Sequence, residues 1–171
     1  MNKRNPLSYS IWFMPETEIR NILEDQIDIL RNKYGGPKIV PHVTLASGFL
    51  GKKGQLINKV NTLSKHLKRG KLFFQGVFYE DEYFRSIYLK IKYDLYLKEM
   101  RRTSLKYFDC QENIYLPHMS LAYGDYNVNV KKQMKRYFNF SLDYFFIDRI
   151  CLAHNNEAKL KWNIIDTFKI K

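Results

Sequence analysis

The chain has 171 residues, which is enough for one domain with a substantial core and short for two independent domains. Hydrophobic residues make up 45% of the chain and charged residues 27%, proportions that are ordinary for a soluble globular protein. No segment has the composition of a signal peptide or the length of a membrane-spanning helix. We therefore expect a cytoplasmic protein without a membrane partner.

The charge of the chain is strongly positive. Lysine and arginine number 29 against 17 aspartate and glutamate, a formal net charge of +12 that is spread along the sequence. Such a field attracts ligands that carry phosphate, although a lysine-rich solvated surface would give the same composition. The two cysteines, Cys110 and Cys151, have no zinc-ligand spacing. We expect reduced thiols, and a disulfide between them stays open.

The first half of the chain alternates strands and helices. Residues 8–14 are rich in β-formers and stop at Pro15, and Thr17 is the expected cap of a helix that ends before Gly35. The next expected elements are a strand over 39–46, a turn over 48–54 and an amphipathic helix over 56–67 that is closed by Gly70.

The second half repeats this alternation. The expected elements, in chain order, are strands over 72–79 and 83–91 joined by an acidic turn at 80–82, a helix over 95–108, a strand over 114–123, a short helix over 128–137, and closing strands over 142–154 and 158–170. The mixed order favours an α+β fold over a doubly wound parallel sheet.

One octapeptide occurs twice. Residues 41–48 read PHVTLASG and residues 117–124 read PHMSLAYG, so His42 and His118 lie 76 residues apart, close to half the chain. This spacing predicts a single domain over 1–171 with an internal pseudo-repeat, whose halves lie near 1–75 and 76–171. On a strand, side chains two residues apart share a face. Each copy therefore presents an imidazole together with a hydroxyl, from Thr44 and Ser120.

Two such pairs suit the cleavage of a phosphodiester. One imidazole can remove a proton from the attacking oxygen while the other protonates the leaving oxygen, because an unperturbed histidine titrates near neutral pH. The hydroxyls are suited to hold the non-bridging phosphate oxygens. No carboxylate and histidine cluster has metal-ligand spacing, so we predict metal-independent chemistry without a cofactor.

The duplicated motif resembles the 2H phosphoesterase superfamily, and most closely its plant and yeast cyclic phosphodiesterase branch. Besides the two histidine motifs, the strand at residues 10–15 and the aromatic-led strand at 83–89 match that branch. The resemblance implies a bilobal fold, in which two pseudo-symmetric lobes of mostly antiparallel sheet with outer helices surround a central groove.

The resemblance also implies an activity. In that branch the substrates are ADP-ribose 1″,2″-cyclic phosphate, which tRNA splicing leaves, and nucleoside 2′,3′-cyclic phosphates, which open to 2′-phosphates. Carried over, one of His42 and His118 activates water and the other protonates the leaving oxygen; we expect His118 to be the base and His42 the acid. Thr44 and Ser120 would bind phosphate oxygens.

Three aromatic residues stand where the family places contacts to base or ribose, namely Trp12, Phe84 and Tyr123. Trp12 shares a strand face with Ser8 and Ser10, which fits exposure to the groove. Strict alternation puts Tyr123 on the face opposite His118, so it reaches the groove only if the strand bends near Gly124.

Other features of the chain give weaker signals. His66 and His154 lack a repeated partner, so we do not expect catalytic roles for them. The pair at 101–102 fits contact with RNA or a nucleotide pyrophosphate, and it fits a basic helix surface equally well.

Other functions stay open at this point. A related enzyme could cleave 2′-5′ oligoadenylate or cyclic oligonucleotide signals, or process RNA ends, with the same histidines. A module that binds RNA ends without turnover is the alternative outside enzymes, and the intact histidines and hydroxyls disfavour it. The expected partner is a nucleotide or RNA-derived cyclic phosphate, with RNA a further candidate, and we expect a monomer.

Overall fold

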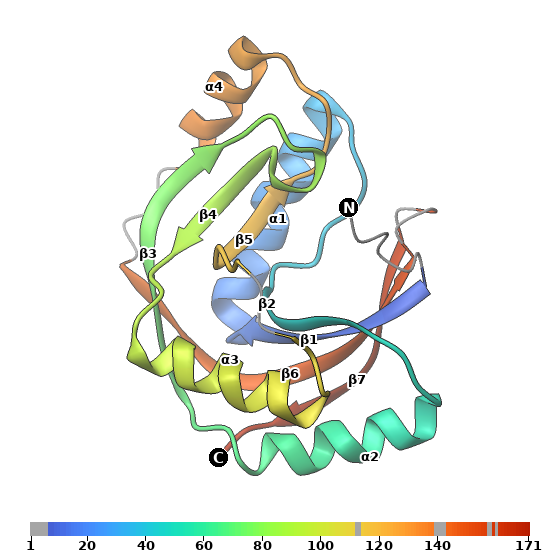
Figure 1. Cartoon of the computed structure of the whole chain (residues 1–171). Coiled ribbons are helices and arrows are strands. Elements are labelled where there is room, and N and C mark those ends of the chain that lie inside the picture. The colour runs from blue at the N-terminus through green and yellow to red at the C-terminus, as the bar shows by residue number, and fades with distance from the viewer. Residues whose placement is uncertain (1–6, 112–113, 139–142, 157–158, 160) are drawn as a thin grey trace.

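A computed structural model describes residues 7–111, 114–138, 143–156, 159 and 161–171 of the chain (Figure 1). The elements follow in the order β1 (Leu7–Pro15), α1 (Thr17–Tyr34), β2 (Val43–Phe49), α2 (Lys53–Ser64), β3 (Gly70–Tyr79), the 3₁₀ turn η1 (Tyr83–Arg85), β4 (Ile87–Ile91), α3 (Leu95–Tyr107), β5 (His118–Ala122), α4 (Val128–Tyr137), β6 (Tyr144–Asn156) and β7 (Lys161–Lys169).

The described strands form one antiparallel system in the order β2-β1-β6-β3-β4-β5. Strand β7 pairs with residues 149–156 of β6. The expected α+β class is confirmed. Strand β3 joins two parts of this system, because residues 70–73 pair with β6 while 74–79 pair with β4. The ladder shifts register between Phe74 and Val77, where Gly76 takes a φ of +102°. A glycine suits this bulge because L side chains rarely adopt positive φ.

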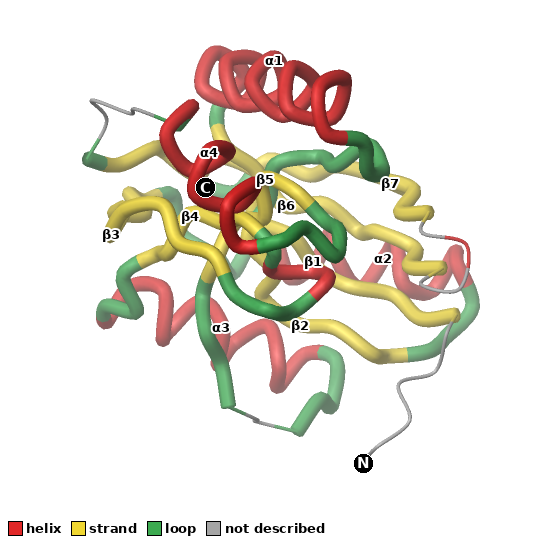
Figure 2. The backbone as a smooth tube through the Cα atoms, turned by 90° about the horizontal axis from the view of Figure 1, so that it is seen from above, coloured by secondary structure: helices red, strands yellow, loops and turns green. Residues whose placement is uncertain are grey.

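Two helices pack against strands that lie far from them in the sequence. Helix α1, which follows β1, packs on β5, and α3, which follows β4, packs on β2. Helix α2 covers β6 and β7, while α4 lies against β3 and β4. Seen from above, α1 lies on one side of the strands and α3 on the opposite side (Figure 2). Each motif strand is therefore supported by a helix from the other half of the chain.

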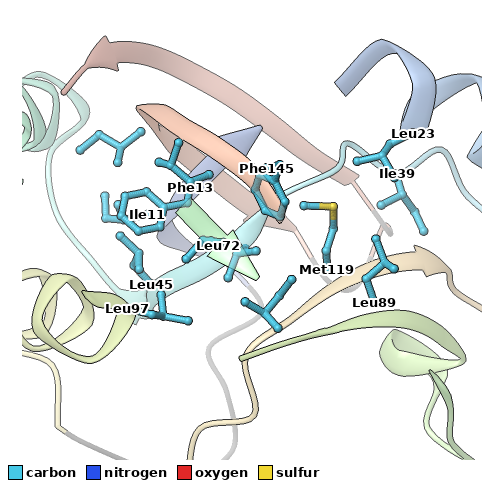
Figure 3. Close-up of a cluster of buried hydrophobic side chains, with 14 of the residues drawn as sticks. Ile11, Phe13, Leu23, Ile39, Leu45, Leu72, Leu89, Leu97, Met119 and Phe145 are labelled. Atoms are coloured by element: carbon cyan, nitrogen blue, oxygen red, sulfur yellow. The ribbon is translucent and has the colours of Figure 1, made fainter. Parts of the chain in front are cut away.

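The core runs continuously beneath both motif strands. Leu45 of β2 and Met119 of β5, the apolar residues that alternate with the motif side chains, are both fully buried. They belong to one cluster with Phe13, Leu72 and Phe145 (Figure 3). Truncating a buried leucine or methionine to alanine costs about 2–5 kcal/mol, so the apolar face of each motif strand is held firmly in place.

Several boundaries differ from the sequence prediction. The strand expected over 39–46 runs from Val43 to Phe49, and the helix expected over 56–67 runs from Lys53 to Ser64. Thr17 is the first helical residue, and Glu16 occupies the N-cap without a side-chain hydrogen bond. The strand predicted over 83–91 begins only at Ile87, because residues 83–85 form the 3₁₀ turn η1. The second motif strand starts at His118, and the described residues just before it lie outside regular structure.

Cys110 and Cys151 form no disulfide with each other in the structure. Within the described part of the chain, no helix is long and apolar enough to cross a membrane.

Candidate functional site

A cavity of about 210 Å³ lies between the two motif strands. All seven residues expected at the site line this cavity: His42, Thr44, His118, Ser120, Trp12, Phe84 and Tyr123. The repeated motif thus marks two walls of a single site.

The two imidazoles are held in the same way. Nδ1 of His42 lies 2.7 Å from the carbonyl oxygen of Val40, and Nδ1 of His118 lies 2.7 Å from that of Leu116. Each accepting carbonyl precedes the motif proline, whose ring restricts the backbone on both sides of it. A carbonyl only accepts, so Nδ1 carries the hydrogen in both rings and Nε2 is the nitrogen available for proton transfer.

The rings that support the histidines differ. Trp12 stacks on His42 with ring centroids 3.6 Å apart and planes 13° from parallel. Tyr88 meets His118 edge-on at 5.7 Å. Trp12 pairs with Thr44 across β1 and β2, while Tyr88 pairs with Ser120 across β4 and β5, so the two rings are equivalent in the repeat.

Trp12 is only 2% exposed. It lines the cavity, as the resemblance implies, but its indole face is covered by the His42 imidazole. Trp12 therefore holds the His42 imidazole in place and excludes water from the face of the imidazole on which it stacks.

The two histidines have different electrostatic surroundings. Burial lowers the pKa of His42 to about 4, against the opposing effect of its bond to the Val40 carbonyl. Burial also lowers the pKa of His118, and the positive charge of Arg85 adds to that decrease, while the bond to Leu116 and the carboxylates of Glu82 and Glu80 oppose it. Two negative neighbours of His118 therefore favour its protonated form, and one positive neighbour, Arg85, disfavours it.

The hydroxyls differ as well. Ser120 Oγ donates to the carbonyl oxygen of Phe84 at 2.9 Å. In the described part of the chain, the Thr44 hydroxyl has no hydrogen-bond partner, and it lines the cavity. Thr44 can donate to a ligand directly, whereas Ser120 has to leave Phe84 first.

Tyr123 reaches the cavity because β5 ends one residue earlier, at Ala122. The following loop is held by Tyr126, whose hydroxyl oxygen lies 2.8 Å from the carbonyl oxygen of Gly35 and 3.0 Å from that of Tyr123, so the two carbonyls share one donor. A Cβ on Gly124 would come within 2.6 Å of the Tyr126 ring, so this turn needs a glycine.

Three aromatic rings from separate elements line the cavity and contact one another. The Tyr123 ring packs edge-on against Phe84 at 5.4 Å and lies 5.3 Å from Trp162 of β7. Phe84 and Trp162 also meet edge-on, at 6.0 Å. Sequence reasoning missed Trp162, since it lies outside both motif copies on the last strand.

Two arginines near the histidines were not singled out for the site. Arg85 lines the cavity and donates through Nε to Glu80 at 3.0 Å. Arg101 also lines it and is 4% exposed, so it does not belong to a basic helix surface, which was one of its two interpretations. The available signal was its spacing from the buried Leu97, because side chains four residues apart share a helix face.

The remaining histidines lie elsewhere. His66 packs near Tyr107 and His154 near Tyr9, and neither lines the cavity. Among the described residues, no three histidine, cysteine, aspartate or glutamate side chains form a group that could hold a metal ion.

The family model and the curated relative that match this chain both belong to the cyclic phosphodiesterases. The family model of "Cyclic phosphodiesterase-like protein" matches residues 7–171. A cyclic phosphodiesterase of Arabidopsis thaliana is 27% identical over 151 residues, covering 85% of this chain and 83% of the plant protein.

Solved structures share the fold at low identity. Escherichia coli LigT in its apo form superposes with a TM-score of 0.61 at 11% identity, covering 96% of this chain and 97% of LigT. A crystal structure described only as that of a phosphoesterase gives 0.60 at 12% identity, over 97% and 99% of the two chains. LigT solved with 3′-AMP gives 0.57 at 11% identity, over 98% and 99%.

Proposed function

This chain belongs to the cyclic phosphodiesterase-like family of 2H phosphoesterases, and we propose that it hydrolyses ribose cyclic phosphates by two-histidine acid–base catalysis. The family makes it a phosphodiester hydrolase. The observation that carries the finer proposal is the matched geometry of His42 and His118, whose Nδ1 atoms are both fixed by backbone carbonyls on the walls of one cavity.

The reaction proposed on a nucleoside 2′,3′-cyclic phosphate is one in-line displacement. A water oxygen bonds to phosphorus and gives its proton to one histidine. The bond from phosphorus to the 3′ oxygen breaks, and the other histidine donates a proton to that oxygen. The product is a nucleoside 2′-phosphate, and no metal ion takes part in this scheme.

The electrostatics of the free site favour His42 as the base and His118 as the acid. With a pKa of about 4, His42 is neutral near pH 7 and can accept the proton of water. The pKa of His118 is lowered too, by burial and by Arg85, but the carboxylates of Glu80 and Glu82 oppose that decrease and favour the proton that the leaving oxygen needs. This division is the reverse of the one expected from the sequence.

The phosphate oxygens would be held by Thr44, by Ser120 once its hydroxyl leaves the Phe84 carbonyl, and by the charge of Arg85. The rings of Phe84, Tyr123 and Trp162 offer edges and faces for a base or ribose.

The size of the cavity favours a small substrate. Its volume of about 210 Å³ lies below the roughly 300–1,000 Å³ of pockets that enclose drug-sized ligands. A ribose cyclic phosphate needs only its reacting end enclosed, whereas a cyclic oligonucleotide signal would need several nucleotides held at once. The names of the relatives agree with a nucleotide cyclic phosphate, since the plant protein is a cyclic phosphodiesterase and LigT was solved with 3′-AMP.

The test is hydrolysis of nucleoside 2′,3′-cyclic monophosphates by the purified protein in the presence of EDTA. We expect a 2′-phosphate product, and we expect His42→Ala and His118→Ala each to abolish turnover. His66→Ala, which changes a histidine outside the cavity, is the matched control and should retain the rate. Activity that survives both site substitutions, or that requires added metal, would contradict the mechanism.

A substrate panel separates this proposal from the others. ADP-ribose 1″,2″-cyclic phosphate, 2′-5′ oligoadenylate and cyclic dinucleotides are compared at equal concentration. A preference for either of the last two would make a signal-degrading enzyme the better description. RNA binding with a steep salt dependence and no product would indicate a binding module.

A separate experiment tests which histidine is the acid and which is the base. A phosphodiester with a nitrophenolate leaving group needs no protonation when the bond breaks. If His118 is the acid, His118→Ala regains turnover on this substrate while His42→Ala does not. The opposite result would restore the assignment expected from the sequence.

A further inference from the structure

An aromatic side chain lies exposed just beyond the wall that carries His118. Phe78 of β3 is 39% exposed, and its ring stacks on Tyr88 of β4 with centroids 6.1 Å apart. Tyr88 in turn meets His118 edge-on at 5.7 Å. Only one buried ring therefore separates an exposed aromatic surface from a histidine of the candidate site.

Two ammonium groups flank this ring. Lys90 Nζ lies 5.5 Å and Lys135 Nζ 5.4 Å from the centroid of Phe78. Lys90 stands directly opposite His118 in the β4–β5 ladder, so it lies between the site and the exposed ring. Lys135 comes from α4, a different element, so the three side chains converge from two strands and a helix.

The positive charge continues along α4. Lys132, Lys135 and Arg136 line an open hollow together with Tyr79 and Phe138. Helix α4 contains no acidic residue. Within the described residues, neither these three cations nor Lys90 makes a salt bridge.

Two acidic side chains that follow β3, Glu80 and Asp81, already have partners. Glu80 pairs with Arg85 and accepts from the Tyr88 hydroxyl, and Asp81 pairs with the buried Lys131. The surface therefore keeps an uncompensated positive charge beside an exposed ring.

Lysines that merely shield an apolar ring would be expected to cover it. Here more than a third of Phe78 stays accessible, and the cations extend beyond the ring along α4. Exposed aromatic rings set among cations are the arrangement that binds single-stranded nucleic acid, because bases stack on the rings while phosphates meet the charges.

We propose that Phe78, Lys90, Lys132, Lys135 and Arg136, the aromatic–lysine track, bind the nucleotides that precede a terminal 2′,3′-cyclic phosphate in single-stranded RNA. The inference rests on the proposed function and adds to the same site a binding surface for the nucleotides that precede the reacting end. The cavity takes the terminal ribose phosphate, and the strand leaves it past Lys90 toward Phe78.

The experiment compares two substrates that share a reacting end. One is cytidine 2′,3′-cyclic phosphate, and the other is a short oligoribonucleotide that ends in the same cytidine 2′,3′-cyclic phosphate. The measured quantity is the ratio of kcat/KM for the oligonucleotide to kcat/KM for the mononucleotide. Because each variant is compared with itself, a partly unfolded variant lowers both rates and leaves this ratio intact.

We expect the ratio to exceed one in the wild-type protein and to fall about tenfold in Phe78→Ala, the size of effect that removing one stacked base gives. For the oligonucleotide, the logarithm of kcat/KM should fall with the logarithm of the salt concentration. In the double variant Lys132→Gln, Lys135→Gln this slope should become less steep by about 0.7 for each phosphate that is no longer neutralised. Phe146→Ala removes another exposed aromatic, which is 45% exposed, and is the control that keeps the ratio.

Two kinds of failure can be told apart. If the wild-type protein hydrolyses the mononucleotide but shows no preference for the oligonucleotide, or if Phe78→Ala keeps the preference, the track is wrong and the proposed function stands. If neither substrate is hydrolysed, the proposed function fails and the track fails with it.

Discussion

The hydroxyl of Tyr115 donates a 2.7 Å hydrogen bond to the backbone carbonyl of Thr44, across 71 residues of sequence. Tyr115 precedes His118 by three residues, and Thr44 follows His42 by two. Arg101 supports the bond from one side, with its guanidinium 3.9 Å above the Tyr115 ring and a 2.6 Å bond to the carbonyl of Leu45. The two motif copies are thus tied together by side chains that belong to neither.

The first prediction concerns this tie. Tyr115→Phe keeps the ring beneath Arg101 but removes the donor to Thr44, so the distance between the two histidines becomes less fixed. We expect kcat on a nucleoside 2′,3′-cyclic phosphate to fall about tenfold or more, because small misplacements of reacting groups are costly. KM should change little, and the free energy of unfolding should fall by about 1 kcal/mol.

The matched control is Tyr93→Phe, since the Tyr93 ring packs edge-on against Tyr115 at 5.2 Å and is itself 39% exposed. Steady-state kinetics and urea unfolding of both variants decide the matter. A Tyr115→Phe enzyme that keeps its kcat would show that the bond has no positioning role.

The second prediction concerns the pH dependence of kcat/KM. In the proposed mechanism the free enzyme reacts with His42 neutral and His118 protonated, so the rate should rise as His42 loses its proton, at about pH 4. It should fall as His118 loses its proton, and because burial lowers that pKa, the falling limb lies below 6.5. The bell therefore has an acidic optimum.

The complex should behave differently from the free enzyme. A bound phosphate anion favours both protonated imidazoles, so the pH profile of kcat should lie at higher pH than that of kcat/KM. Rate measurements over the range from acid to slightly alkaline pH test both statements. A kcat/KM that keeps rising through neutral pH would contradict the low pKa values.

Much of the candidate site could be predicted from the sequence because its central motif occurs twice, at residues 41–48 and 117–124. Two copies of a short strand motif predict which side chains share a face, and the structure places His42 and His118 on one cavity. The supporting residues have no such repeat. Trp162 reaches the cavity only because β7 pairs with β6, and Arg101 only because α3 crosses to β2.

The expected strand over 83–91 shows why local pattern alone is insufficient. Its aromatic and β-branched residues favour a strand, yet residues 83–85 turn so that the carbonyl of Phe84 accepts from Ser120. That bond is made across 36 residues, and only the assembled fold provides it.

The third prediction separates the two hydroxyls. Thr44→Val removes a hydroxyl that has no hydrogen-bond partner within the described structure, so we expect the free energy of unfolding to stay unchanged. The substitution should still lower kcat/KM by about 100-fold, the typical effect of removing one donor to a developing oxyanion.

Ser120→Ala differs because it also removes the bond to Phe84. It should lower kcat/KM and, in addition, reduce the free energy of unfolding by about 1 kcal/mol. Kinetics and urea unfolding of the two variants side by side make the comparison. Equal effects of both substitutions on stability would show that the two half-sites are more symmetric than the hydrogen bonds indicate.

The last prediction concerns stability in acid. Burial against Trp12 lowers the pKa of His42 from 6.5 to about 4, so between these values the folded state binds fewer protons at this site than the unfolded state. The resulting stabilisation is complete above pH 6.5 and is lost as the pH falls toward 4. Its upper limit is about 3 kcal/mol, from 1.36 kcal/mol per pKa unit.

His42→Gln cannot titrate, so its free energy of unfolding should fall less steeply over this range than that of the wild-type protein. His66→Gln, at an exposed position, should follow the wild-type curve. Urea unfolding at small, regular steps of pH measures all three proteins, and a His42→Gln curve parallel to the wild type would show that His42 is not protected from protonation by the fold.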